Sequence, residues 1–316
     1  MRKLSLALFA LAGFLLVSIG AIHAQDEATR NEFMAQYTPI AQLIQKGQSA
    51  DAAKMTATEF KHVSLLGKEG NADQWGKEIK ATLSLFKAPE VKTTLTSLSI
   101  KGEEATAIFS NLATGDGTLA DGRTGALSFN IIERTLWAKV GGMWKLKTVK
   151  HVMQESRIDK RLIPFKAPSA DADAQQALQQ IYDLMSDVYG KADWATLEKT
   201  IPDTFPIYDM TGAQISKKEL IDRLKKGAKL IQNPIVFMTI QAMGRDGDTV
   251  KVVRLATIIG DVTLPDGKTG RLKYINTTRE TWVKGEKTWG SKKSEELHAD
   301  ATLDGKPLPL ALIAGN

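Results

Sequence analysis

The chain has 316 residues, of which 43% are hydrophobic and 25% charged, so its composition is that of a globular protein long enough for two domains. It contains no cysteine, which excludes disulfides, thiolate nucleophiles and thiolate metal sites. The net charge is +6, and without Arg2 and Lys3 it is +4, because 40 basic residues then remain against 36 acidic ones. So small a surplus of positive charge does not indicate nucleic-acid binding.

Residues 1–24 have the pattern of a secretory signal peptide. A basic start, MRK, precedes an apolar run from Leu4 to Ile22, and AIHA before Gln25 offers a cleavage site after Ala24. The alternative is an uncleaved membrane anchor, because the run approaches the roughly 20 residues that span a bilayer. Small and polar residues within the run and the polar QDEATR after it favour cleavage. We therefore expect a periplasmic or secreted protein.

Residues 28–162 predict a first α+β domain. A helix comes first, with an apolar stripe that ends before Gly47 and consists of Met34, Tyr37, Ile40, Leu43 and Ile44. A short helix (SADAAKMTAT), a short edge strand (EFKHVSLLG) and a third helix that begins at Asn71 follow. The rest alternates between apolar and polar residues around Asp121-Gly122, which predicts a meander of about four antiparallel strands.

Residues 163–171 form the predicted linker, and residues 172–298 repeat the same order of elements. The first helix stops at Gly190 and has an apolar stripe of Leu178, Ile181, Tyr182, Met185 and Val188. The third helix opens with the capping-box sequence Ser-Lys-Lys-Glu at Ser216, and the meander turns at Asp266-Gly267. Residues 299–316 are the predicted C-terminal tail.

The two halves are an internal repeat. Residues 118–144 and 263–289 match at 11 of 27 positions without a gap, at a constant offset of 145. One unit of helix, helix, short strand, helix and meander therefore occurs twice, and each unit is an α+β fold in which a curved sheet wraps its helices.

This order of elements resembles the nuclear transport factor 2-like (NTF2-like) superfamily. The pattern F-x-x-x-D-x-x-G-x-x-x-S-K-x-E-L at 205–220 and the ending T-x-W-V-K…W at 281–289 are similar to its SnoaL-like polyketide-cyclase and ketosteroid-isomerase-like branch. The resemblance implies two tandem cone-shaped domains, each with three helices packed on a curved antiparallel sheet. The scaffold carries isomerases, cyclases, dehydratases and binding modules alike, so it assigns no activity.

The resemblance also implies catalytic candidates in the second copy. The steroid-acting members use an Asp base at the end of the short strand, where this chain has Asp209. Their Tyr donor position holds Met185 here, and Tyr182 lies one turn earlier, while their second acid falls near Arg279 or Glu280. The alternative for Asp209 is a cap of the turn that follows it. The first copy has Ser64 in the matching place, which cannot act as that base.

Five residues are candidates for a ligand pocket: Tyr37, His62, His151, Met185 and Tyr208. Tyr37 matches Tyr182 across the repeat, and core packing is the alternative for both. His62 and His151 have no neighbouring ligand spacing, and the chain has no HxH, HExxH, P-loop or GxGxxG motif. The sequence therefore predicts neither a metal nor a cofactor.

From these features we expect a noncatalytic module that binds a small, mostly apolar ligand or a partner protein, but no nucleic acid. A purely structural pair of domains with filled cavities is one alternative. An isomerase-, cyclase- or dehydratase-like enzyme with Asp209 as its base is the other. We also expect the two domains to form an intramolecular pseudo-dimer through exposed strand faces that carry Trp137 and Trp282.

Overall fold

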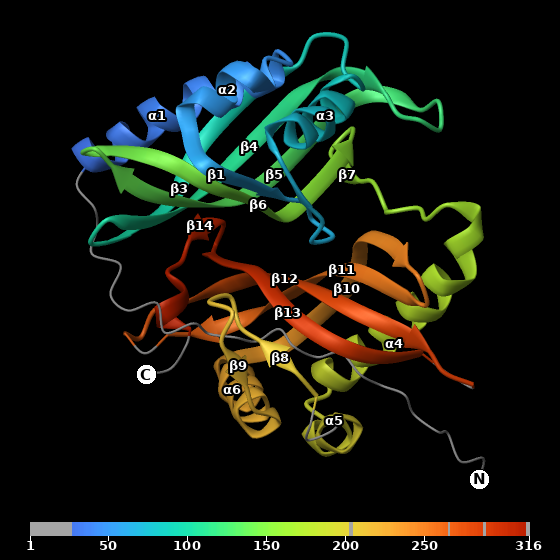
Figure 1. Cartoon of the computed structure of the whole chain (residues 1–316). Coiled ribbons are helices and arrows are strands. Elements are labelled where there is room, and N and C mark those ends of the chain that lie inside the picture. The colour runs from blue at the N-terminus through green and yellow to red at the C-terminus, as the bar shows by residue number, and fades with distance from the viewer. Residues whose placement is uncertain (1–26, 202–204, 265, 287–288, 314–316) are drawn as a thin grey trace. The chain divides into compact units, whose positions relative to one another are not determined.

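The computed structural model of the chain describes residues 27–201, 205–264, 266–286 and 289–313 (Figure 1). The predicted leader, residues 1–24, lies outside these ranges. The described residues divide into two compact units, with the boundary between Ile163 and Pro164. Each unit combines helices with one sheet, so the predicted fold class of two tandem α+β domains is confirmed.

The first domain contains three helices and a sheet. Its helices are α1 (Glu27–Gln45), α2 (Ser49–Met55) and α3 (Ala72–Leu83). Its strands are β1 (Thr56–Val63), β2 (Glu69–Gly70), β3 (Glu90–Lys101), β4 (Glu104–Thr118), β5 (Thr124–Val140), β6 (Met143–Ile158) and β7 (Arg161–Leu162). Figure 1 shows the three helices on one face of this sheet.

The second domain repeats this order. Its helices are η1 (Ser169–Asp171), α4 (Ala172–Gly190), α5 (Trp194–Thr200), α6 (Lys217–Leu230) and η2 (Leu310–Leu312). Its strands are β8 (Ile207–Tyr208), β9 (Gln214–Ile215), β10 (Ile231–Asp246), β11 (Thr249–Thr263), β12 (Thr269–Lys284), β13 (Trp289–Leu303) and β14 (Lys306–Pro307).

Both sheets have the same topology over the described residues. The strand orders are β2-β1-β6-β5-β4-β3 and β10-β11-β12-β13-β8-β9, and β7 and β14 add to β6 and β13. The four long strands form the predicted antiparallel meander. The short strands β1 and β8 run parallel to β6 and β13, which brings the segment after the second helix against the last long strand.

The turns between long strands follow the predicted signals. Gly122 and Gly267 have φ values of +85° and +83°, a conformation that glycine adopts without strain. Gly122 N donates to the Leu119 carbonyl and Gly267 N to the Leu264 carbonyl, each at 2.9 Å. The same turn therefore closes the same hairpin in both copies.

Trp137 and Trp282 are buried, which corrects their predicted place on exposed strand faces. Their side chains are 1% and 0% exposed, and each lies in the hydrophobic core of its own domain. Phe33 of α1 packs edge-on against Trp137, with ring centroids 5.4 Å apart. The strand face that carries each tryptophan therefore faces its own helices.

The helices that shape the interior begin at well-formed caps. Asn71 and Gln74 form a reciprocal capping box at the start of α3, with backbone-to-side-chain distances of 3.0 and 3.1 Å. Ser216 Oγ accepts from the Glu219 backbone at the start of α6. Because α3 begins at a fixed residue, its turns direct Trp75 and Ile79 toward the sheet.

The C-terminal segment corrects one predicted boundary. The predicted tail, residues 299–316, contributes the end of β13 and all of β14 to the second sheet. Ala301 is 1% exposed, because alternate residues of this segment continue the core-facing side of β13. Within the described residues, no helix is long and apolar enough to cross a membrane.

Candidate functional site

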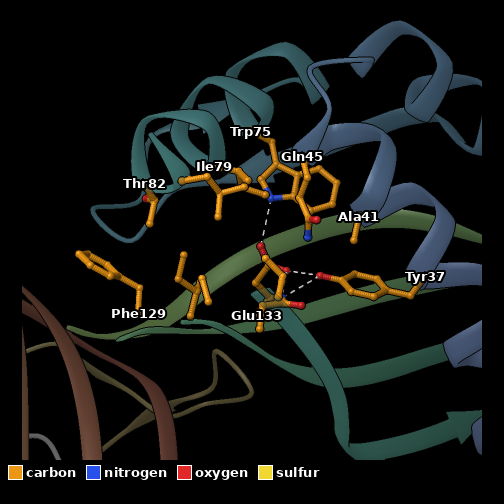
Figure 2. Close-up of a pocket in the computed structure, with 13 residues that line it drawn as sticks. Tyr37, Ala41, Gln45, Trp75, Ile79, Thr82, Phe129 and Glu133 are labelled. Carbon is orange, nitrogen blue, oxygen red and sulfur yellow. Dashed lines mark hydrogen bonds between the residues drawn. The ribbon is translucent and has the colours of Figure 1, made fainter. Parts of the chain in front are cut away.

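A buried carboxylate, Glu133, is the centre of the first domain's polar interior. It is 1% exposed, and its oxygens accept four hydrogen bonds. Oε1 accepts from Trp75 Nε1 at 3.0 Å and from His151 Nε2 at 2.8 Å. Oε2 accepts from the Tyr37 hydroxyl and from Asn111 Nδ2, the latter at 2.9 Å. Figure 2 shows Trp75 and Tyr37 directed at Glu133 from two different helices.

The five side chains of this cluster come from five different helices and strands, and each lies on the inward-facing side of its element. Tyr37 belongs to the buried face of α1, and Trp75 to that of α3. Glu133 and His151 are direct partners in the register of β5 and β6, so their side chains leave the sheet on one face. A bulge between Ile132 and Glu133 sets that register.

The hydrogen bonds determine the charge state of the cluster. Burial opposes a charge on Glu133, but the hydrogen bond and positive charge of His151, with the hydrogen bonds of Tyr37 and Trp75, lower the pKa of Glu133. Burial likewise opposes a charge on His151, but the hydrogen bond and charge of Glu133 and the charge of Glu78 raise the pKa of His151. Both shifts favour the charged pair, a carboxylate and an imidazolium, over the neutral one.

A second histidine lies beside this pair. The His62 and His151 ring centroids are 4.8 Å apart, and the His62 ring also stacks on Trp75. Burial, and then the charge of His151, lower the pKa of His62 to about 4, so His62 is neutral at pH 7. Glu78 of α3 faces both rings, with Oε2 at 3.6 Å from His62 Nε2 and 3.5 Å from His151 Nδ1.

These three side chains are also a group with metal-ligand chemistry. The ligand atoms of His62, Glu78 and His151 all lie within 4.8 Å of one another. The sequence predicted no metal because the three residues come from β1, α3 and β6 and have no short spacing. Only the packing of α3 over the β1–β6 pair brings them together.

An apolar recess adjoins Glu133. It lies between α1, α3 and the strands β3, β4 and β5 (Figure 2). About 40 Å³ of it admits water-sized molecules, and the whole recess with its open mouth measures about 460 Å³. Its walls are formed by Tyr37, Ala41, Gln45, Trp75, Ile79, Thr82, Leu83, Val91, Asn111, Ala113, Phe129, Ile131 and Glu133.

The second domain has a related, buried polar centre. The Tyr182 hydroxyl donates to Glu280 Oε2 at 2.6 Å, and Trp282 Nε1 donates to the same oxygen at 3.1 Å. Arg254 Nε donates to Glu280 Oε1 at 3.0 Å, and both of these side chains are buried. Burial raises the pKa of Glu280, and Arg254, Tyr182 and Trp282 offset only part of this rise. The structure thus brings together two of the three predicted catalytic candidates, Tyr182 and Glu280.

Asp209, the third candidate, is bonded within its own turn. Its Oδ1 accepts from the backbone of Thr211 at 2.9 Å, from the backbone of Ala213 at 3.1 Å and from the Thr211 hydroxyl at 2.5 Å. These are the contacts of a turn cap, the alternative weighed from the sequence.

The predicted pocket residues divide between the two domains. Tyr37, His62 and His151 lie in the one cluster around Glu133. Met185 is 2% exposed in the core of the second domain. Tyr208 lies under the ammonium of Lys293, which is 4.8 Å from its ring centroid.

Sequence reasoning missed Glu133, Trp75, Asn111, Glu78 and Arg254. A signal existed for Glu133, because alternation along the strand places Glu133 and Thr135 on the same face as the buried Trp137. A signal existed for Arg254 too, because it interrupts an apolar run in the buried middle of β11. A charged residue at a core-facing position needs a buried partner, and this requirement marks a site.

No family model matches the chain, and no curated protein matches it. Solved structures do match. The Kfla4162 protein of Kribbella flavida is 16% identical, with 41% of this chain and 95% of that one covered at a TM-score of 0.32. An NTF2-like protein with a cystatin-like fold from Novosphingobium aromaticivorans is 12% identical, with 46% and 86% covered at a TM-score of 0.30.

A third similar structure is a hexachlorocyclohexane dehydrochlorinase, LinA type 2. It is 13% identical, with 45% of this chain and 95% of that one covered at a TM-score of 0.33. Each of the three matches covers about half of this chain. One of the three, the Novosphingobium protein, is described as NTF2-like, the superfamily that the order of elements resembles.

Proposed function

We propose that this protein is an exported, noncatalytic binding module whose first domain holds a small, mostly apolar molecule in the recess beside Glu133. The observation that carries the proposal is the recess itself, whose wall is largely aliphatic and aromatic. Export rests on the leader pattern of residues 1–24.

The size of the recess limits the molecule. The space of about 40 Å³ holds one or two waters, so a ligand must place most of its atoms in the open mouth. Gln45 and Thr82 line the recess with side chains that are not in the buried core, and they can move aside at low cost. A compact apolar molecule, of the size of a substituted benzene or an indole, fits these conditions.

The bonding of Glu133 supports a binding role over a catalytic one. A carboxylate has about four lone-pair positions, and Glu133 already accepts four hydrogen bonds. It cannot take a proton from a ligand without the loss of a buried hydrogen bond, which costs about 1–3 kcal/mol. Asn111 is equally engaged, since its Nδ2 donates to Tyr37 and Glu133 and its Oδ1 accepts from Thr93.

The enzyme alternative in the second domain has less support. It requires the Asp209 carboxylate to face a bound substrate, but this carboxylate accepts three hydrogen bonds from its own turn. It also requires Glu280 to donate to a substrate, but both Glu280 oxygens already accept hydrogen bonds, Oε1 from Arg254 and Oε2 from Tyr182 and Trp282.

The test is retention of a ligand by protein purified from its own host. Native mass spectrometry of the intact chain, followed by analysis of the denatured extract, should show one small apolar molecule bound substoichiometrically or fully. Thr82→Trp, which places an indole at the mouth of the recess, should reduce the retained amount at least about tenfold. Ala81→Trp is the matched control, because Ala81 is an exposed neighbour that does not line the recess.

Two outcomes count against the proposal. One is equal retention by wild type, Thr82→Trp and Ala81→Trp, which would place the ligand elsewhere. The other is an empty protein whose amide NMR spectrum around Ala113 and Ile131 does not respond to millimolar indole or toluene.

A further inference from the structure

We propose that His62, Glu78 and His151 form a binding site for one divalent transition-metal ion, with zinc as the best-matched ion. The ligand atoms are His62 Nε2, His151 Nδ1 and Glu78 Oε2. The proposal concerns a site beside the recess and does not depend on the ligand proposed for the recess.

The positions of the three atoms match the size of a tetrahedral zinc site. Zinc bonds of about 2.0–2.1 Å to nitrogen and oxygen place neighbouring ligand atoms roughly 3.3–3.4 Å apart. Glu78 Oε2 is 3.6 Å from His62 Nε2 and 3.5 Å from His151 Nδ1. No pair of the three ligand atoms exceeds 4.8 Å, so an ion needs only a small inward movement of the two rings.

His62 provides a second, independent indication. Its side chain is 1% exposed, and its Nε2 is buried without a hydrogen-bond partner. A buried polar atom that lacks a partner is uncommon and calls for a bound water or ion. This atom is directed at the same Glu78 oxygen that faces His151 Nδ1.

Glu133 orients the other histidine for metal binding. His151 Nε2 is 2.8 Å from Glu133 Oε1, so the proton on Nε2 points at the carboxylate, and a bound ion would replace the proton on Nδ1, which is directed at Glu78. A ligating histidine that donates its other ring N–H to a carboxylate is the usual second layer of a zinc site. The negative charges of Glu133 and Glu78 together balance a divalent ion.

The surroundings leave a way in for the ion. The two rings are buried, but the side chain of Glu78 is 43% exposed, so the site is open on the helix side. Water can therefore complete the coordination. Two imidazoles and one carboxylate suit zinc and its neighbours in the first transition row better than calcium or magnesium, which prefer oxygen ligands.

The second domain provides a natural contrast. In the strand registers His62 pairs with Val149 and Ile207 pairs with Ser294, so the offset of 145 places Ile207 at the position of His62. The same offset gives Arg223 for Glu78 and Glu296 for His151. None of the three ligands is retained, so we expect one ion per chain.

The test is calorimetric titration of the full-length chain with zinc chloride after removal of metals with EDTA. We expect one zinc per chain. Glu78→Gln should weaken binding at least about tenfold, whereas Glu59→Gln, which makes the same charge change at an exposed residue of β1, should leave it unchanged. Equal affinity of wild type and Glu78→Gln, or no saturable binding, would overturn the proposal.

Histidine NMR provides a measurement that needs no variant. One equivalent of zinc should shift the ring signals of His62 and His151 and leave those of His298, in the second domain, in place. A shift of His298 without a shift of His62 and His151 would show adventitious binding only and would refute the site.

Discussion

The two domains have the same interior design but a different cation. In each, a tyrosine of the first helix donates to a buried glutamate, and a tryptophan indole donates to it as well. In the first domain the glutamate is Glu133 and its cation is His151. In the second it is Glu280 and its cation is Arg254.

The glutamate has moved between the copies without leaving its strand face. The offset of 145 aligns Glu133 with Thr278 and Thr135 with Glu280. The glutamate and the threonine have therefore swapped positions, and these positions are two residues apart on the strand. A step of two keeps the side chain on the same face of a strand. A buried acid can therefore shift along a strand as long as its donors reach it.

The choice of cation determines what each centre can do. A guanidinium keeps its charge at all accessible pH values, so the Arg254–Glu280 pair is a fixed structural element. An imidazole can lose its proton or bind a metal ion, so the His151–Glu133 pair can respond to its surroundings. The recess and the second histidine, His62, also belong to the first domain, which contains His151.

The largest expected difference between the two centres is in the loss of unfolding free energy when each glutamate is replaced by glutamine. Glu280→Gln leaves the buried charge of Arg254 without its partner, and we expect a loss of about 3–5 kcal/mol in the unfolding free energy of the second domain. Glu133→Gln should cost the first domain less, about 1–3 kcal/mol, because His151 can shed its proton. Hydrogen exchange of β12 and β5 amides measures the two domains separately.

The same two variants have different pH dependence. Glu133 has a lowered pKa and His151 a raised one, so their pair stabilises the fold between these two values and is lost above the raised pKa of His151. The cost of Glu133→Gln should therefore shrink toward pH 9, while that of Glu280→Gln should not shrink, because Arg254 keeps its charge there. Equal costs at all pH values would remove the distinction between the two cations.

His62 has a pKa lowered to about 4, so it should bind a proton only in acidic solution. In the metal-free protein with EDTA, its ring signals should titrate near that value, and those of His151 above about 6.5. Unfolded histidine binds a proton near pH 6.5, so the stability due to neutral His62 is full above that pH and is lost as pH falls toward 4. The loss is on the order of 2–3 kcal/mol.

A variant gives the control for this titration. His62→Phe keeps a ring against Trp75 but cannot bind a proton, so it should flatten the stability curve between about pH 6.5 and 4. Titration of His62 near its ordinary value, with an unchanged curve in His62→Phe, would mean that burial and the nearby His151 charge do not act on it.

The sequence predicted the helices and turns of both domains well. The apolar stripe with Tyr37 and Ile40, the turn at Gly122 and the cap at Ser216 each depend on local chemistry, and each is found where it was expected. The constant offset of 145 predicted that the second domain would repeat the first.

The polar centres could not be predicted in the same way. Trp75, Glu133 and His151 belong to three elements, and their contact depends on the angle at which α3 packs on the sheet. Glu78 looked like an ordinary exposed helix residue, and only its distance to two histidines distinguishes it. Trp137 was placed on an exposed face because alternation alone does not tell which side of a strand faces the helices.

The smallest expected effect concerns Asp209 and its counterpart Ser64. Both accept a backbone hydrogen bond in the turn after the short strand, Asp209 from Thr211 and Ala213 and Ser64 from Lys68 at 3.1 Å. Both turns end at a glycine with positive φ, +84° at Gly212 and +82° at Gly67. Asp209→Ser therefore gives the second domain the cap of the first.

If Asp209 is a turn cap, its replacement should have modest and purely structural consequences. Asp209→Ala removes the acceptor of two backbone bonds and should lower the unfolding free energy of the second domain by about 0.5–1.5 kcal/mol, with Asp209→Ser and Asp209→Asn in between. Urea titration with exchange of β13 amides measures this, and the ligand retained by the first domain should not change. Asp209→Asn would contradict this interpretation if it kept full stability but abolished turnover of a β,γ-unsaturated ketone that the wild type isomerises, because a cap contributes to folding and a base contributes to rate.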